Sequence, residues 1–290
     1  MFTRSLYNAV KKFGDISWNF SEQCLNQKWK EQAYHEDIRS AFFLMYEELR
    51  DLAVKTSHLR NKQKFTITTA QKAAAQYHAA FRDLQAVLTG IDDNLMDRRP
   101  ASEEWPLRIT LGHMILCDRT FFAVIRYAIS QAEQGKMPTG ITEEDAEELM
   151  GSYHDFEKRM DQASLEDILE YSGTLHDRIL TELGILKEEE LRINTLWWEE
   201  RPVPIEFRLY RFESHFRQHT IQVEKTLANL HIETGESKRL LRLIYAALAD
   251  TEGLAIGAWD VGTDLWVELT ERIIQRTIEI GNLNLIKNYR

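Results

Sequence analysis

The sequence predicts an all-α protein, with a four-helix bundle at the centre of the chain and additional helices at both ends. The 290 residues include only 13 glycines and 5 prolines, about half the combined share of an average protein. The prolines leave three proline-free blocks, residues 1–99, 139–201 and 205–290. Because proline breaks helix interiors, these blocks have room for long helices, and apolar residues recur through them at helical spacing.

The first block predicts two helices. Ser17 is a candidate N-cap for the first, which we expect to be interrupted near residues 34–35. Thr68 and Gln71 then form a capping-box pattern ahead of the second helix. That helix should end near Gly90, because glycine commonly follows a helix. The apolar stripe of the first helix comprises Leu25, Trp29, Ile38, Phe42, Met45, Leu49 and Leu52.

The centre of the chain predicts three further bundle helices. One should carry Pro106 in its first turn, where proline is tolerated. Another should begin at the capping pair Ser164 and Asp167. The segment 187–204 contains two tryptophans and two prolines and is expected to be irregular, and the last bundle helix should span about 205–231.

The order of these predicted helices divides the chain into three segments. Residues 1–66 form an N-terminal helical extension, residues 67–235 the four-helix bundle, and residues 236–290 a C-terminal helical pair whose turn lies at Gly257 and Gly262. The C-terminal pair has broad apolar faces that must be buried, and the N-terminal extension is the expected cover.

Composition narrows the class of protein. The formal net charge of −10 argues against a nucleic-acid partner. No apolar run exceeds six residues, whereas a membrane-spanning helix needs about 20. Two cysteines exclude a disulfide framework and fit a reducing compartment. We therefore expect a cytoplasmic protein with neither a nucleic-acid nor a membrane partner.

Familiar catalytic motifs are absent. The sequence has no glycine-rich phosphate loop, no dinucleotide fingerprint, no Gly-x-Ser-x-Gly elbow and no Cys-x-x-Cys pair. None of the nine histidines follows a glutamate by three residues, which argues against a ferritin-like di-iron site. For six histidines we expect no functional role, and four of these are expected at the solvated surface. The four are His35, His58, His154 and His176, and the other two are His78 and His231.

The other three histidines are candidate metal ligands. His215 and His219 are four residues apart, so they lie on one side of a helix, at or beside its apolar stripe. His113 flanks the apolar stripe of another helix, and Asp118 lies on the buried side of that helix. Three imidazoles with an open fourth position form the ligand set of a catalytic zinc-type site. The alternative is a group of hydrogen-bonded polar residues in the core.

The order of these residues resembles that of the DinB superfamily of metal-binding four-helix bundles, over about residues 67–235. The matching residues are Trp105, Leu111-Gly112-His113, Asp118, His215, His219 and Gln222. The resemblance implies a divalent metal ion, with zinc and nickel expected, held by His113, His215 and His219. Asp118 and Gln222 are the candidates for orienting the ligating histidines, and the alternatives are a buried polar hydrogen bond for Asp118 and a solvated amide for Gln222.

The resemblance also implies two functional hypotheses. Related families use low-molecular-weight thiols such as bacillithiol or mycothiol, so one hypothesis is a metal-dependent thiol S-transferase acting on a small electrophile. The alternative is a non-catalytic metal-binding bundle with a structural, sensing or protein-interaction role, and a homodimer is left open. Trp197, Trp198 and Tyr210 are candidates for the mouth of the site, or else cap the core, and Cys117 is expected to be a small buried residue.

Overall fold

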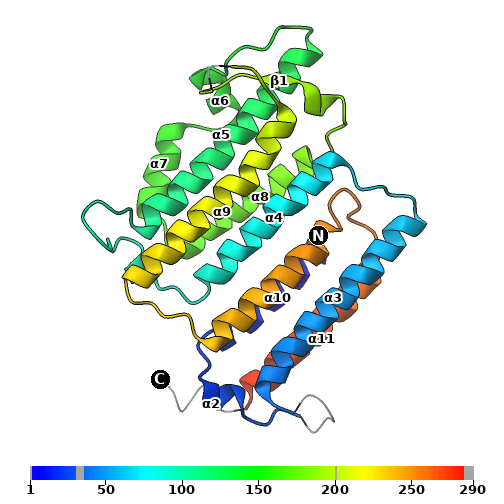
Figure 1. Ribbon diagram of the computed structural model, residues 1–290, viewed down its shortest axis with the longest axis vertical. Coiled ribbons are helices and arrows are strands. Elements are labelled where there is room, and N and C mark those ends of the chain that lie inside the picture. The colour runs from blue at the N-terminus through cyan, green and yellow to red at the C-terminus, as the bar shows by residue number, and fades with distance from the viewer. Residues whose placement is uncertain (1, 31–35, 200, 284–290) are drawn as a thin grey trace. The chain divides into compact units, whose positions relative to one another are not determined.

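The computed structural model describes residues 2–30, 36–199 and 201–283, and α-helices dominate these residues (Figure 1). The all-α prediction is therefore confirmed. The interruption expected near residues 34–35 lies outside the described residues. Among the described helices, none is long and apolar enough to cross a membrane.

Packing divides the chain into two compact units. The first unit comprises Met1–Thr66, Phe81–Ile91 and Glu233–Arg290, and the second comprises Ile67–Ala80 and Asp92–Ile232. Helix α4 (Thr69–Leu88) contributes to both units. The domain boundaries expected at residues 66 and 235 stay a prediction.

The first unit is built from helices of both chain ends. These are α1 (Phe2–Ser17), α2 (Glu22–Leu25), α3 (Ile38–Lys62), α10 (Glu236–Gly253) and α11 (Thr263–Gly281). Helix α3 packs against α10, and α1 packs against α11. In the core, the rings of Phe13 and Phe42 meet edge to face with centroids 4.9 Å apart, and Trp266 is fully buried.

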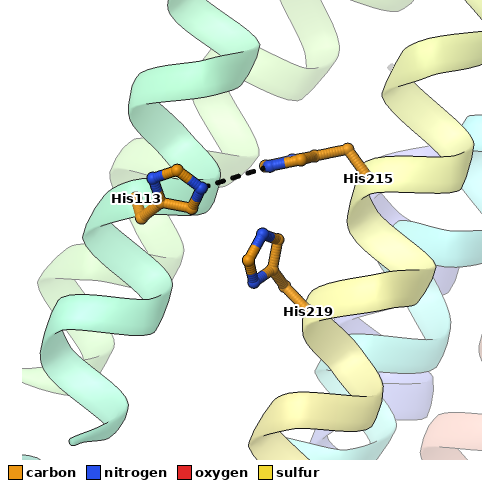
Figure 2. A group of neighbouring side chains, drawn as sticks. All are labelled: His113, His215 and His219. Carbon is orange, nitrogen blue, oxygen red and sulfur yellow. Dashed lines mark hydrogen bonds between the residues drawn. The ribbon is translucent and has the colours of Figure 1, made fainter. Parts of the chain in front are cut away.

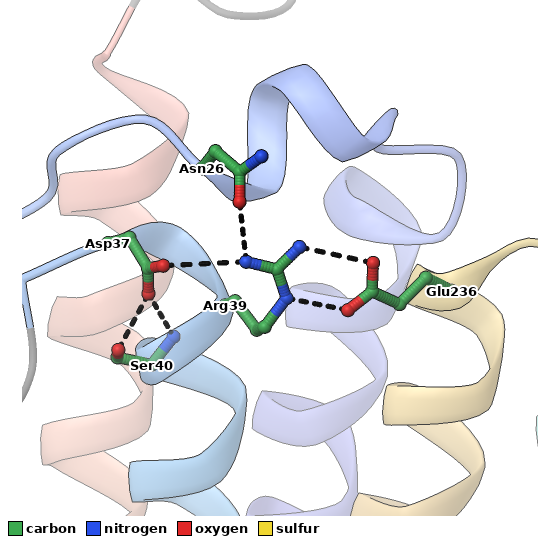
Figure 3. Close-up of polar contacts among 5 residues, drawn as sticks. All are labelled: Asn26, Asp37, Arg39, Ser40 and Glu236. Carbon is green, nitrogen blue, oxygen red and sulfur yellow. Dashed lines mark hydrogen bonds and ion pairs between the residues drawn. The ribbon is translucent and has the colours of Figure 1, made fainter.

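Hydrogen bonds of Arg39 join the first turn of α3 to the first turn of α10 (Figure 3). Its guanidinium donates to both carboxylate oxygens of Glu236, the first residue of α10, at 2.5 and 3.1 Å. It also donates to the side-chain oxygen of Asn26 at 2.6 Å. Asp37 caps α3 by accepting a hydrogen bond from the backbone N–H of Ser40 at 2.8 Å. Hydrogen bonds of the Arg39 guanidinium therefore link α3 with α10 and with the residue that follows α2.

Ser17 does not begin a helix, contrary to the expectation from the sequence. It is the last residue of α1, and its hydroxyl donates to the carbonyl oxygen of Phe13 at 2.7 Å. Serine hydroxyls can bond back to the preceding helical turn as readily as they cap an N-terminus, so residue type alone does not distinguish the two positions. The N-cap of the next helix is Ser21.

The second unit is a four-helix bundle with short additions. Its bundle helices are the first turns of α4, α5 (Leu107–Glu133), α8 (Leu165–Leu183) and α9 (Ile205–Asn229). The additions are η1 (Asp93–Leu95), α6 (Glu143–Met150), α7 (Tyr153–Gln162), η2 (Glu190–Arg192) and the two-stranded ribbon of β1 (Asn194–Thr195) and β2 (Val203–Pro204). Both expected capping boxes are present, at Thr68 with Gln71 and at Ser164 with Asp167.

We expect Gly90→Ala to destabilise the first unit by about 2–5 kcal/mol. Gly90 has a φ of +74°, and an added Cβ would lie 2.2 Å from the indole ring of Trp18. Gly14→Ala is the matched control, since an added Cβ there would make only ordinary contacts at 3.7 Å inside a helix. Urea unfolding of both variants measures the effect, and equal stabilities would contradict the expected steric conflict.

Candidate metal centre

Three histidines from two helices of the second unit form one cluster (Figure 2). His113 lies on α5, and His215 and His219 lie on successive turns of α9. The Nε2 atoms of His113 and His215 are 3.3 Å apart. Each residue offers a ring nitrogen such that all three atoms lie within 4.8 Å of one another. Among the described residues, this is the one group of three or more His, Cys, Asp or Glu side chains with that geometry.

The antiparallel pairing of α5 with α9 creates the cluster. The His113 ring contacts His219 with centroids 4.8 Å apart, whereas Phe121, two turns further along α5, contacts His215 and Phe212 at 5.8 and 5.4 Å. Later residues of α5 thus meet earlier residues of α9. His215 and His219 share a face because four residues make about one helical turn.

Burial favours the neutral form of His113 and His215. His215 and His219 are each 6% exposed, and His113 is half-buried. Burial lowers the pKa of His215 to about 3, with further lowering from the neighbouring His219 and His113. Burial also lowers the pKa of His113, helped by His219. Neutral imidazole is the form whose nitrogen lone pair binds a metal ion.

Gln222 orients one of the three rings. Its side-chain oxygen lies 2.8 Å from Nδ1 of His219. An amide oxygen only accepts hydrogen bonds, so Nδ1 carries the proton, and Nε2 is left with a lone pair. Figure 2 shows one ring nitrogen of His219 directed toward the other two rings. The structure therefore places Gln222 where the sequence analysis expects an orienting residue.

Asp118, the other expected orienting residue, lies elsewhere. Its Oδ2 accepts a hydrogen bond from the hydroxyl of Tyr77 on α4, and Oδ1 is buried with no hydrogen-bond partner among the described residues. No described hydrogen bond joins Asp118 to the histidine cluster. Burial raises the pKa of Asp118 well above its usual range, outweighing the opposite effect of the Tyr77 hydrogen bond.

A second pair of histidines is buried in the same bundle. Nδ1 of His78 and Nε2 of His176 are 2.8 Å apart, and the rings stack with centroids 5.1 Å apart. The expectation of a solvated His176 is wrong, since the residue is 1% exposed. The sequence carries a signal for this burial, because His176 lies one turn before the buried Leu180 on α8. Of the other histidines expected at the surface, His58 and His154 are exposed, and His35 lies outside the described residues.

Aromatic rings flank the cluster along α5. The Trp105 ring, just before α5, lies 5.3 Å from His113 and is 39% exposed. On the other side, Trp197 contacts Phe121 at 5.8 Å, and Phe121 contacts His215. Trp198 and Tyr210 are exposed, and no described ring contact joins either of them to the three histidines.

The loop that carries Trp197 is anchored by a fully buried arginine. Arg208 donates to both carboxylate oxygens of Glu199 at 2.9 and 2.8 Å and also donates to the Thr195 hydroxyl. Burial raises the pKa of Glu199, but the hydrogen bond and charge of Arg208 outweigh burial, so the net pKa lies below its usual value. The segment 187–204, which we expect to be irregular, is thus joined to α9 by the hydrogen bonds of Arg208.

Cys117 lies beside the cluster without joining it. Its sulfur is 3.7 Å from Nε2 of His113, on the preceding turn of α5. Burial raises the pKa of the Cys117 thiol to about 11, so the thiol is protonated at neutral pH. The residue is half-buried, and it is not one of the three side chains whose ligand atoms converge.

Asp118→Asn tests the environment of the buried carboxyl. In the unfolded chain an aspartate ionises near pH 4, whereas in the folded protein its raised pKa keeps it protonated to higher pH. Stability from the protonated form is complete below about pH 4 and is lost as pH rises through the folded pKa. The variant, which cannot ionise, should therefore gain stability relative to wild type between about pH 4 and 7. Urea unfolding across this range measures the difference, and a difference independent of pH would contradict the raised pKa.

Comparison with protein families finds a match over the region that contains the histidine cluster. Residues 76–223 match the family model of the DinB superfamily, which covers 148 of the 290 residues and includes all three clustered histidines. No curated protein and no solved structure shows significant similarity to the chain. The match includes Trp105 and Gln222, and it ends within α9. The chain belongs to the DinB superfamily.

Proposed function

We propose that the chain binds a divalent metal ion through His113, His215 and His219 and acts as a metal-dependent thiol S-transferase. The observation that carries the metal site is the convergence of one ring nitrogen from each of three histidines within 4.8 Å. Zinc and nickel are the expected ions, because imidazole ligands suit both. The co-substrates would be a low-molecular-weight thiol and a small electrophile.

The hydrogen bonding of the cluster supports a bound cation. The Nε2 atoms of His113 and His215 are 3.3 Å apart, so one ring can donate a hydrogen bond to the other without an ion, and both can direct a lone pair to an ion that binds between the rings. Gln222 accepts a hydrogen bond from Nδ1 of His219, which leaves Nε2 of that ring, the nitrogen directed toward the other two rings, available as a ligand atom.

The chemistry follows from three protein ligands and a free position. A divalent ion supplies Lewis acidity there, which favours the thiolate form of a bound thiol. In the transfer, the thiol loses its proton, a bond forms between its sulfur and the electrophilic carbon, and the leaving group departs with the bonding electron pair. Trp105 contacts His113, and Trp197 contacts Phe121, which contacts His215, so both indoles would help to exclude water from the centre.

Burial of the cluster favours a second candidate function, a non-catalytic metal-binding bundle. His215 and His219 are 6% exposed, and Cys117 lies close enough to His113 to close the coordination shell after a change of rotamer. In a structural site the metal contributes mainly to folding stability. Removal of the metal would then lower the melting temperature, and an added thiol would find no free position.

Metal content by elemental mass spectrometry tests the site. Untagged wild-type protein should retain about one zinc or nickel ion per chain after dialysis, because three imidazoles converge. The double variant His215→Ala/His219→Ala should retain almost none. His154→Ala/His231→Ala is the control, since both residues are exposed histidines, and it should match wild type. An absence of metal in wild type, even after reconstitution with divalent ions, would contradict the proposal.

A further inference from the structure

Arg211 lies on the same face of α9 as the histidine cluster. It precedes His215 by four residues, as His215 precedes His219, so the three side chains follow one another along the helix. Arg211 is half-buried. Side chains four residues apart on a helix leave it about 5–6 Å from one another, so the Arg211 side chain starts beside the ring of His215.

The guanidinium of Arg211 has no carboxylate partner among the described residues. Its one described hydrogen bond goes to the hydroxyl of Ser214 at 3.5 Å. The charge of Arg211 helps to lower the pKa of Glu199, but both carboxylate oxygens of Glu199 accept hydrogen bonds from Arg208. The next arginine of α9, Arg217, is paired with Glu213 at 3.1 Å. The guanidinium N–H groups of Arg211 are therefore available to an acceptor beside the candidate metal centre. This positive charge belongs to a chain whose formal net charge is −10.

We propose that Arg211 binds a carboxylate of the ligand that enters the metal centre, so that the site selects thiols bearing a carboxylate a few bonds from the sulfur. This inference rests on the proposed function, because it requires a thiol at the free coordination position. Guanidinium binds carboxylates through two parallel hydrogen bonds, which gives both affinity and orientation. One helical turn, about 5.4 Å along the axis, separates Arg211 from His215. A ligand that reaches both therefore needs only a few bonds between its sulfur and its carboxylate.

Two small thiols of matched size test the inference on cobalt-loaded protein. 3-Mercaptopropionate carries the carboxylate, and 3-mercaptopropionamide replaces it with a neutral amide. Binding is followed anaerobically by the sulfur-to-cobalt charge-transfer absorption. We expect the ratio of the two affinities, carboxylate over amide, to fall about tenfold from wild type to Arg211→Gln, the effect of losing a charge-assisted hydrogen bond. Both thiols are measured on each protein, so their different acidities cancel.

Arg217→Gln is the matched control, with the same change of charge on the same helix, and its affinity ratio should equal that of wild type. If Arg211→Gln fails to fold, the affinity ratio in wild-type protein at low and high salt replaces it, and the ratio should fall as salt screens the charge pair.

The outcomes separate this inference from the function on which it rests. If both thiols bind and their affinity ratio is unchanged in Arg211→Gln, or in wild type at high salt, the role of Arg211 is wrong and the thiol site stands. If neither thiol changes the spectrum of cobalt-loaded wild type, both the thiol-transfer proposal and the role of Arg211 are wrong.

Discussion

The candidate centre depends on the register of α5 against α9. The two helices run antiparallel, and their alignment sets His113 opposite His215 and His219 while Phe121 meets Phe212 one layer further along. A shift by one helical turn, about 5.4 Å, would separate ring nitrogens that now lie within 4.8 Å. Apolar layers on either side of the histidines fix this register, because α5 and α9 are both rich in buried aromatic and aliphatic residues.

Several polar side chains in the interior of the second unit form hydrogen bonds with one another. Asp118 bonds Tyr77, His78 bonds His176, and Arg208 bonds Glu199, all with strongly buried members. Burying polar groups costs free energy unless each finds a partner. Most of these groups do, and the pairs link α4 with α5, α4 with α8, and α9 with the loop that carries Trp197. Two buried atoms of this interior, Oδ1 of Asp118 and Nδ1 of His215, have no hydrogen-bond partner among the described residues.

Local features of the fold could be predicted from the sequence, whereas features that depend on distant partners could not. The capping boxes at Thr68 and Ser164 are encoded within four residues, and both are present. The prediction that Ser17 is an N-cap is wrong because a serine hydroxyl can also donate to a carbonyl oxygen of the preceding helical turn, here that of Phe13. The helix spacing places His215 beside His219. The place of His113 beside an apolar stripe makes it a candidate, but helix spacing cannot show that it meets a histidine 102 residues later, and the order of motifs along the chain supplies that link.

The partners of the buried polar side chains show the same limit. The sequence leaves Asp118 either to orient a ligating histidine or to form a buried polar hydrogen bond, and the structure shows the second, with Tyr77, 41 residues away on another helix. The partner of His176 is 98 residues away. Hydrophobic periodicity shows which face of a helix is buried, but it does not show which polar group from another helix meets it there.

X-ray absorption at the zinc edge of reconstituted protein tests the central claim most directly. The expected spectrum shows three imidazole ligands near 2.0 Å and a light, non-protein ligand in the fourth position. Sulfur scattering should appear only after a thiol is added. Sulfur in the shell before any thiol is present would mean that Cys117 closes the site, and a shell of oxygen ligands without imidazole would mean that His113, His215 and His219 do not hold the ion.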